Sequence, residues 1–478
     1  MTSPPPGPMA FWQSVGLRFL PFADAASTDL PLGRLLRLAL FQVSVGIAVV
    51  LLNGTLNRVL IVELGTPSWI VALMIAVPLT IAPFRALIGH RSDIHRSMLG
   101  WRRVPYIWFG TLAQFGGLAI MPFALILLTR PDTFALGIAG ACASFLLTGA
   151  GMHVTQTAGL ALATDLAPAD SRPRVVALLY LMLLVGMVLA SFAIGGLLRD
   201  FSATRLVQLI QGAAVLTMVL NMAALWKQEA RRPRAVVDAL PRPAFATLWA
   251  SYVAQPGARR LLIAIGVGTM AFAMQDALLE PFGGDVLGLS VGSTTALTGT
   301  WALGAILAFA YAGQRLANGA DPLRLAGLGL VVGIAAFLLA IFAVPVGAAG
   351  LLFAAAAIIG LGSGLFAMGT MIAAMGLASG AAAGLALGAW GAVQASCAGL
   401  GIALGGVLRD TIDGAAMAGA LGPVLASRAT GYGAVYLLEI MLLLAALVVL
   451  GPMVGRHAPA TGPGQAAPGR FGLSEFPT

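Results

Sequence analysis

The chain has 478 residues, of which 59% are hydrophobic and only 9% are charged. Soluble domains average about 25% charged residues, so this composition excludes an ordinary soluble protein. The apolar runs are continuous and long enough to cross about 30 Å of hydrocarbon as helices, which argues against the alternating strands of a β-barrel. The net charge of +9 does not indicate nucleic-acid binding, because the placement of the cations around a membrane accounts for it.

Apolar runs between turn signals predict twelve transmembrane helices in two groups of six. The first six spans cover residues 36–62, 67–89, 104–129, 133–163, 173–198 and 203–226. The second six cover 259–282, 291–313, 325–345, 347–376, 381–408 and 432–455. The expected domains are thus an N-terminal cytoplasmic or interfacial segment (1–35), a first half (36–226), a cytoplasmic linker (227–258), a second half (259–455) and a cytoplasmic tail (456–478). We expect the Gly-, Pro- and Ala-rich tail to be disordered.

The cations predict which way these helices face. With a cytoplasmic N-terminus, 21 of the 27 Lys and Arg residues fall on the cytoplasmic side, five fall outside, and Arg58 lies within a span. This is the bias of the positive-inside rule. We therefore expect a multi-pass membrane protein with both termini in the cytoplasm.

A short basic loop recurs after the second span of each half. Between spans 2 and 3 it contains the loop-motif residues Gly89, Asp93, Arg96, Arg102 and Arg103. Between spans 8 and 9, about 224 positions later, Gly, Asp and Arg recur over residues 313–324. This pattern resembles the major facilitator superfamily, which implies an all-α, twelve-helix bundle of two parallel six-helix repeats. The charges of such a loop cap helix ends, and they also latch the halves as these move.

Longer motifs resemble a narrower family. Residues 85–108 (RALIGHRSDIHRSMLGWRRVPYIW) and 275–284 (QDALLEPFGG) are similar to the two signatures of the PucC/LhaA group, the bacteriochlorophyll delivery family. Residues 20–26 (LPFADAA) and 51–58 (LLNGTLNR) fit the same family. The resemblance extends over essentially all twelve spans.

The resemblance implies a non-enzymatic assembly factor for the light-harvesting antenna of purple phototrophs. Such a protein handles bacteriochlorophyll, antenna polypeptides or both, and we favour the LhaA-like branch, which serves the core antenna around the reaction centre. The expected partners extend to the reaction centre–antenna complex, bacteriochlorophyll synthase, the membrane insertion machinery and lipids, with no nucleic acid and no protein-bound metal ion. The alternatives are a PucC-like factor for the peripheral antenna, a scaffold that does not touch pigment, and a proton-coupled small-solute transporter, which the fold alone would indicate.

Polar side chains inside the membrane are costly and are therefore candidate functional residues. Asn53, Asn57 and Arg58 in span 1 match the depth of Gln275, Asp276 and Glu280 in span 7. The last five of these form a predicted polar cluster, in which Asp276 or Glu280 would pair with Arg58, because an unpaired charge there is expensive. The cluster is interpreted either as an ion pair joining the halves or as a periplasmic gate or ligand contact.

Three residues are candidate pigment ligands. His153 is the one histidine within the predicted spans, and imidazole commonly fills the axial position of a chlorin magnesium. Against this interpretation, a lone histidine in a membrane helix is more often hydrogen-bonded to a neighbouring helix. Gln156, one turn further along the same span, and Asn53 are the other candidates.

Overall fold

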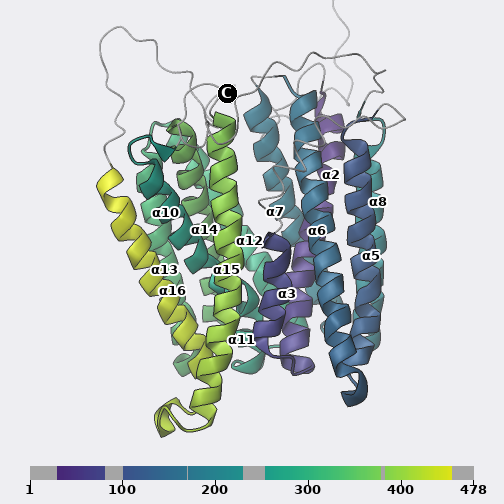
Figure 1. Cartoon of the computed structure of the whole chain (residues 1–478), viewed down its shortest axis with the longest axis vertical. Coiled ribbons are helices and arrows are strands. Elements are labelled where there is room, and N and C mark those ends of the chain that lie inside the picture. Colours follow the sequence, from purple (N-terminus) through teal and green to yellow (C-terminus); the bar gives the residue numbers. More distant parts are fainter. Residues whose placement is uncertain (1–29, 81–100, 169–170, 230–252, 378–382, 455–478) are drawn as a thin grey trace, which may run out of the picture.

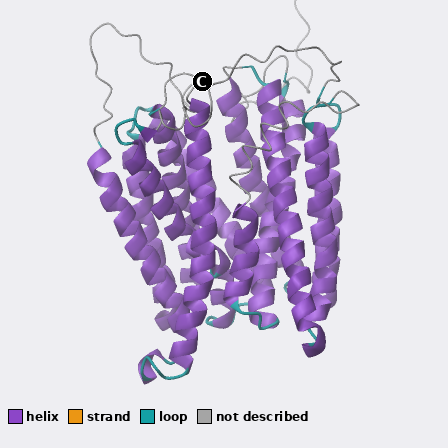
Figure 2. Cartoon of the chain, viewed as in Figure 1, coloured by secondary structure: helices purple, strands orange, loops and turns teal. Residues whose placement is uncertain are grey.

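The structure, a computed structural model, is a bundle of helices that run along one common direction (Figure 1). It describes residues 30–80, 101–168, 171–229, 253–377 and 383–454. Figure 2 shows that the described residues form helices joined by loops, with no strands among them. The N-terminal segment, most of the linker, the tail, and the loop-motif residues Gly89, Asp93 and Arg96 lie outside the described residues.

The helices pack as a first and a second group of six. The first group contains α2 (Leu32–Val49) with its π-helical continuations Val50–Leu56 and Val59–Glu63, α3 (Ser68–Thr80), α5 (Val104–Leu128), α6 (Phe134–Leu166), α7 (Arg172–Leu197) and α8 (Ala203–Leu225). In the second group, α10 (Ala258–Ala273) and α11 (Leu279–Asp285) together form the first membrane crossing. The other five crossings are α12 (Val291–Ala317), α13 (Pro322–Val346), α14 (Ala349–Gly376), α15 (Ala383–Met417) and α16 (Ala429–Leu450). We call the end of the bundle that carries residues 226–229 and 253–258 the linker end, and the opposite end, with α11 and the loop 418–428, the distal end (Figure 1).

The helix lengths confirm a multi-pass membrane protein. In the described part of the chain, eleven helices are long and apolar enough to cross a membrane. The remaining predicted span, 67–89, begins as the short apolar helix α3 and continues into residues that are not described. Each of the twelve predicted spans therefore corresponds to a helix.

Two contacts between helices join the groups, and the two contacts are equivalent under the repeat. α7 packs on α12, and α3 packs on α15, so that in both cases the fifth helix of one group meets the second helix of the other. Small residues allow the close approach. A Cβ on Gly292 would lie 2.4 Å from the carbonyl oxygen of Gly195, and one on Gly406 would lie 2.5 Å from the Cβ of Ala72.

The seventh crossing is broken, although the sequence predicts one continuous span over residues 259–282. α10 ends at Ala273, a 3-10 turn covers Met274–Ala277, and α11 begins at Leu279. Pro281 explains the break, because proline has no N–H to donate to the carbonyl four residues earlier and its ring clashes with that carbonyl. We call Met274–Ala277 the helix break. It places two polar residues, Gln275 and Asp276, in the turn.

The eleventh crossing is longer than predicted. The sequence places its end at residue 408, where the charged residues begin, whereas α15 continues to Met417. The helix can continue because Arg409 forms ion pairs with Asp410, Asp413 and a neighbouring aspartate, as described below. A 35-residue helix is roughly 50 Å long and exceeds the thickness of the hydrocarbon core.

The surroundings of two glycines in the second group predict different effects of a Gly→Ala substitution on the stability of the fold. A Cβ on Gly360 of α14 would lie 1.9 Å from the carbonyl oxygen of Trp301 in α12. We therefore expect Gly360→Ala to destabilise the fold by about 1–3 kcal/mol through overpacking, measured as a lower melting temperature in detergent. The matched control is Gly433→Ala in α16, where no atom lies within 4 Å of the added Cβ. Equal melting temperatures for the two variants would contradict the prediction.

Candidate functional site

Three predicted polar residues of the seventh crossing meet at the helix break. Gln275 donates from Nε2 to the carbonyl oxygen of Phe272, at 3.3 Å, and to the carboxylate of Asp276. Thr298 of α12 donates from its hydroxyl to Glu280 Oε1, at 2.7 Å. Gln275 and Glu280 are buried, whereas Asp276 is half-buried. Hydrogen bonds from the second group alone therefore hold these side chains.

Arg58 does not pair with Asp276 or Glu280, so the predicted ion pair is wrong. Its guanidinium forms an ion pair with Glu63, five residues later in the same crossing, and donates to the carbonyl oxygen of Leu289 at 3.2 Å. A Cβ on Gly284 would lie 2.9 Å from Arg58 Nε, so the guanidinium rests directly against α11. Arg58 thus joins the two groups through a backbone carbonyl instead of through a carboxylate. Glu63 was not predicted as its partner, because it lies one residue beyond the predicted span 36–62.

The remaining residues of the first crossing make local contacts. Asn57 is fully buried and donates from Nδ2 to the carbonyl oxygen of Asn53 at 3.0 Å. Both asparagines belong to the part of the first crossing that winds as a π-helix or flanks it, a geometry that often marks functional sites. The polar residues of the first crossing and those of the seventh crossing therefore share no hydrogen bond.

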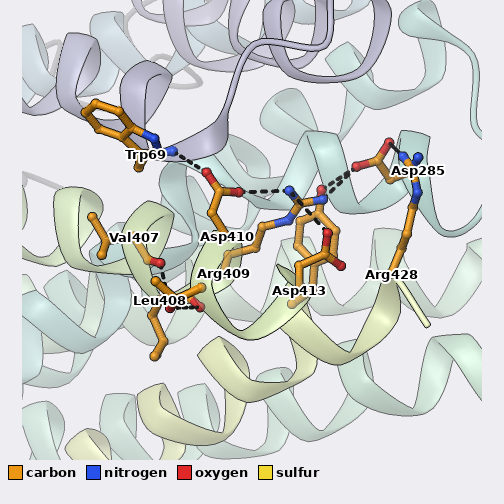
Figure 3. Close-up of polar contacts among 10 residues, drawn as sticks. Trp69, Asp285, Val407, Leu408, Arg409, Asp410, Asp413 and Arg428 are labelled. Atoms are coloured by element: carbon orange, nitrogen blue, oxygen red, sulfur yellow. Dashed lines mark hydrogen bonds and ion pairs between the residues drawn. The ribbon is translucent and has the colours of Figure 1, made fainter. Parts of the chain in front are cut away.

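A second charged site at the distal end was not predicted. Arg409, which the sequence placed in an outer loop, is buried in α15 and lies between acidic groups (Figure 3). Its guanidinium is 3.1 Å from Asp285 Oδ2, 2.9 Å from Asp410 Oδ1 and 4.0 Å from Asp413 Oδ2. We call these four residues the Arg409 cluster.

Tyr432 and Arg428 lie next to the Arg409 cluster and contact its acidic and basic groups. The Tyr432 hydroxyl donates to Asp285 Oδ2 at 2.8 Å, and the Arg409 guanidinium carbon lies 4.6 Å from the centre of the Tyr432 ring. Arg428, from the loop before α16, approaches Asp285 Oδ1 at 3.6 Å. The spacing Arg409, Asp410, Asp413, with the i and i+4 residues on one helix face, was the available signal in the sequence.

The Arg409 cluster also connects the two groups of helices. The backbone N–H of Trp69, in the first turn of α3, donates to Asp410 Oδ2 at 2.8 Å (Figure 3). A carboxylate in this position caps the free N–H groups at the start of a helix. A single aspartate of the second group therefore caps the second helix of the first group while it pairs with Arg409.

The pigment candidates occupy two separate places. His153 and Gln156 are buried one turn apart in α6, and Gln156 donates from Nε2 to Oε1 of Gln42 in α2 at 3.3 Å. Asn53 lies eleven residues beyond Gln42, roughly 15 Å further along the first crossing. The structure thus brings His153 and Gln156 together and places Asn53 with Asn57 instead.

At the linker end, the described part of the loop motif forms a charged network. Arg103 Nε and Arg102 Nη2 lie 3.0 and 3.2 Å from Asp165 Oδ2, at the end of α6. The Glu229 carboxylate accepts the backbone N–H groups of Arg102, Arg103 and Val104 at 2.7 to 3.3 Å. The expected capping role is visible here, and its acceptor, Glu229, was not predicted from the sequence.

The fold defines a multi-pass membrane protein with the helical architecture of solved membrane transporters. A solved structure of this fold is that of a bacterial homologue of the human lysosomal transporter Spinster, in an inward-facing and unoccupied conformation. It aligns with a TM-score of 0.65 and 15% sequence identity, covering 87% of this chain and 95% of that chain.

The sequence comparisons show the family. The model described as "PUCC protein" matches residues 55–458, and the chain therefore belongs to the PucC family. "Protein PucC" of Rhodovulum sulfidophilum is 56% identical over 84% of this chain and 90% of its own length. A Rhodobacter capsulatus protein described as "Uncharacterized protein in puhA-bchM intergenic region" is 53% identical over 97% of this chain and 98% of its own length.

The ion-pair geometry predicts which residues are coupled energetically. Arg58→Ala combined with Asp276→Ala should change the free energy of unfolding additively, to within about 0.5 kcal/mol, because the two side chains share no bond. Arg58→Ala combined with Glu63→Ala should be non-additive, because either single change leaves the partner's charge unpaired. Chemical unfolding of the three single variants, the two double variants and the wild type in detergent measures both cycles. Strong coupling between Arg58 and Asp276 would contradict this geometry.

The contacts of the Arg409 cluster predict that Arg409→Ala strongly lowers the stability of the protein. Arg409→Ala leaves the buried Asp285 without its principal partner, which costs about 3–5 kcal/mol when a buried pair is broken. We expect a marked fall in the melting temperature. Arg205→Ala is the matched control, since Arg205 pairs with Asp200 at 3.3 Å on the exposed surface of the same end, where ion pairs contribute little. Similar effects of the two substitutions would count against a structural role for the Arg409 cluster.

Proposed function

We propose that this protein is an assembly factor for the light-harvesting antenna of a purple phototroph, and that it binds or delivers bacteriochlorophyll, chaperones antenna polypeptides, or does both. The observation that carries this proposal is the PucC family match over residues 55–458 on a transporter-type fold. The role is one of binding and presentation in the membrane, without a chemical step. We favour the core antenna, because the relative named for the puhA-bchM region matches this chain over almost its full length.

We further propose that the protein resides in the bacterial inner membrane with the linker end in the cytoplasm. The cation distribution supports this orientation, since Arg102, Arg103 and Arg260 lie at the linker end. Bacteriochlorophyll produced in that membrane would then reach the protein laterally or from the cytoplasmic side. Reaction centre–antenna complexes, bacteriochlorophyll synthase and the insertion machinery are the corresponding candidate partners.

The pigment would be cargo, and α6 offers the donors that fit it. A chlorin magnesium accepts one axial nitrogen or oxygen ligand, and His153 and Gln156 provide both types of donor on one helix. Met152, the residue before His153, packs with Val45 and Ala48 of α2 in a buried apolar cluster. Asn53 is the weaker candidate, because it stands apart from this pair.

The pigment spectrum is the direct test. Protein purified in mild detergent from a pigment-producing host should show chlorin absorption, which His153→Ala should reduce several-fold. Asn221→Ala is the matched control: it removes another buried polar group of the first group, which donates to Thr111 at 3.0 Å, and should leave the absorption unchanged. A wild-type spectrum without chlorin bands would overturn pigment carriage.

Gene deletion separates the remaining alternatives. Loss of the core antenna band supports the favoured role, selective loss of the peripheral band supports the PucC-like role, and unchanged antenna absorption contradicts antenna assembly altogether. A second candidate function is proton-coupled transport of a small solute, which the acidic residues Asp276 and Glu280 at the helix break favour. Proton-driven uptake by reconstituted vesicles would support that alternative.

A further inference from the structure

A carboxyl group lies behind the helix break with nothing to neutralise it. Glu439, in the middle of α16, is fully buried, and neither of its oxygens has a hydrogen-bond partner among the described residues. The groups that face it are the backbone amide of Gln275, the carboxyl of Asp276 and the hydroxyl of Tyr436. The Tyr436 hydroxyl and Gln275 Oε1 are likewise buried without a partner in the described structure.

The cations nearest this region along the bundle are already bound. Arg58 is paired with Glu63, and Arg409 with Asp285 and Asp410. The other acidic group near Tyr436 is Glu280, which would add negative charge rather than remove it. An ionised carboxylate in an apolar interior without a counter-charge is too costly to persist, so Glu439 must be neutral and hold a proton in this conformation.

Asp276 is the more exposed acidic neighbour of Glu439. It is half-buried, whereas Glu280 and Glu439 are buried. Its neighbours Ala273 and Ala277 pack in the hydrophobic core that includes residues of both groups of helices. Asp276 therefore lies at the interface of the two groups, with Glu439 behind it.

The helix break is linked to the distal contact through α15. A Cβ on Gly405 of α15 would lie 2.6 Å from the carbonyl oxygen of Met274, so this helix rests directly on the break. One turn further along α15, Asp410 caps the first turn of α3 through the Trp69 N–H. The same helix therefore contacts both the helix break and the first turn of α3.

We propose that Glu439 is a proton-binding site, loaded through Asp276, whose deprotonation moves the helix break and opens the α3–α15 contact at the distal end. The site would couple the protonation state of the membrane interior to the relative movement of the two groups. This inference is independent of the proposed cargo, because it rests on the second group of helices and on neither His153 nor the pigment.

Spin labels across the distal contact test the coupling in the full chain reconstituted in nanodiscs. Labels at Leu73 of α3 and Val407 of α15, both exposed, are introduced after Cys142 and Cys397 have been replaced by serine. We expect the wild-type distance distribution to change between low and high pH. Glu439→Gln, which keeps the shape but is always neutral, should hold the low-pH distribution throughout.

Two further variants and one spectrum control this test. Asp200→Asn, at an exposed carboxylate of the distal end, should retain the wild-type response. Glu439→Asp keeps a carboxyl group and should retain a pH response if Glu439→Gln fails to fold. Infrared spectroscopy should show a protonated carboxyl band in the wild type that weakens in Glu439→Gln. A wild-type distance that does not change with pH, or the same pH response and infrared band in Glu439→Gln, would overturn the proposal.

Discussion

Charge inside an apolar bundle needs a partner, and this requirement organises the polar side chains of the protein. A hydrocarbon environment offers no water to solvate an ion, so each buried cation must find an acid within reach of its own side chain. Arg58 uses Glu63, and Arg409 uses Asp285 and Asp410. Both arginines lie where the two groups of helices meet, so that local neutralisation and the contact between the groups depend on the same residues.

The helices could be predicted from the sequence, because the length of each apolar run determines whether it can cross the membrane as a helix. The partners of the polar residues could not be. The shift of 224 positions that relates the two groups could not show that Glu63 neutralises Arg58 within one crossing. The helix break had a signal in Pro281, whose effect on a continuous span is known in advance. Glu439 was not predicted as a site, because the sequence shows a single glutamate in an apolar run and does not show which residues surround it.

The symmetry of the fold and the asymmetry of its chemistry have different causes. The exchanged α7–α12 and α3–α15 crossings depend on small residues, and the repeat supplies such residues to both. The carboxyl groups of the interior gather in the second group, around α11 and α16, whereas His153 and Gln156 belong to the first. Packing therefore follows the duplicated architecture, whereas the buried polar side chains differ between the two groups.

The contact between Trp69 and Asp410 joins residues 341 positions apart, and this separation has a consequence for biogenesis. A membrane protein is synthesised from its N-terminus, so the first group of helices enters the bilayer well before α15 emerges from the ribosome. During that interval, the first turn of α3 has no acidic cap from the second group, and the surface that will meet α15 faces lipid or a chaperone. Closure of the distal end is thus among the last events of the protein's own maturation, and a truncated nascent chain would contain the helices of the first group without the contact that seals them to the second.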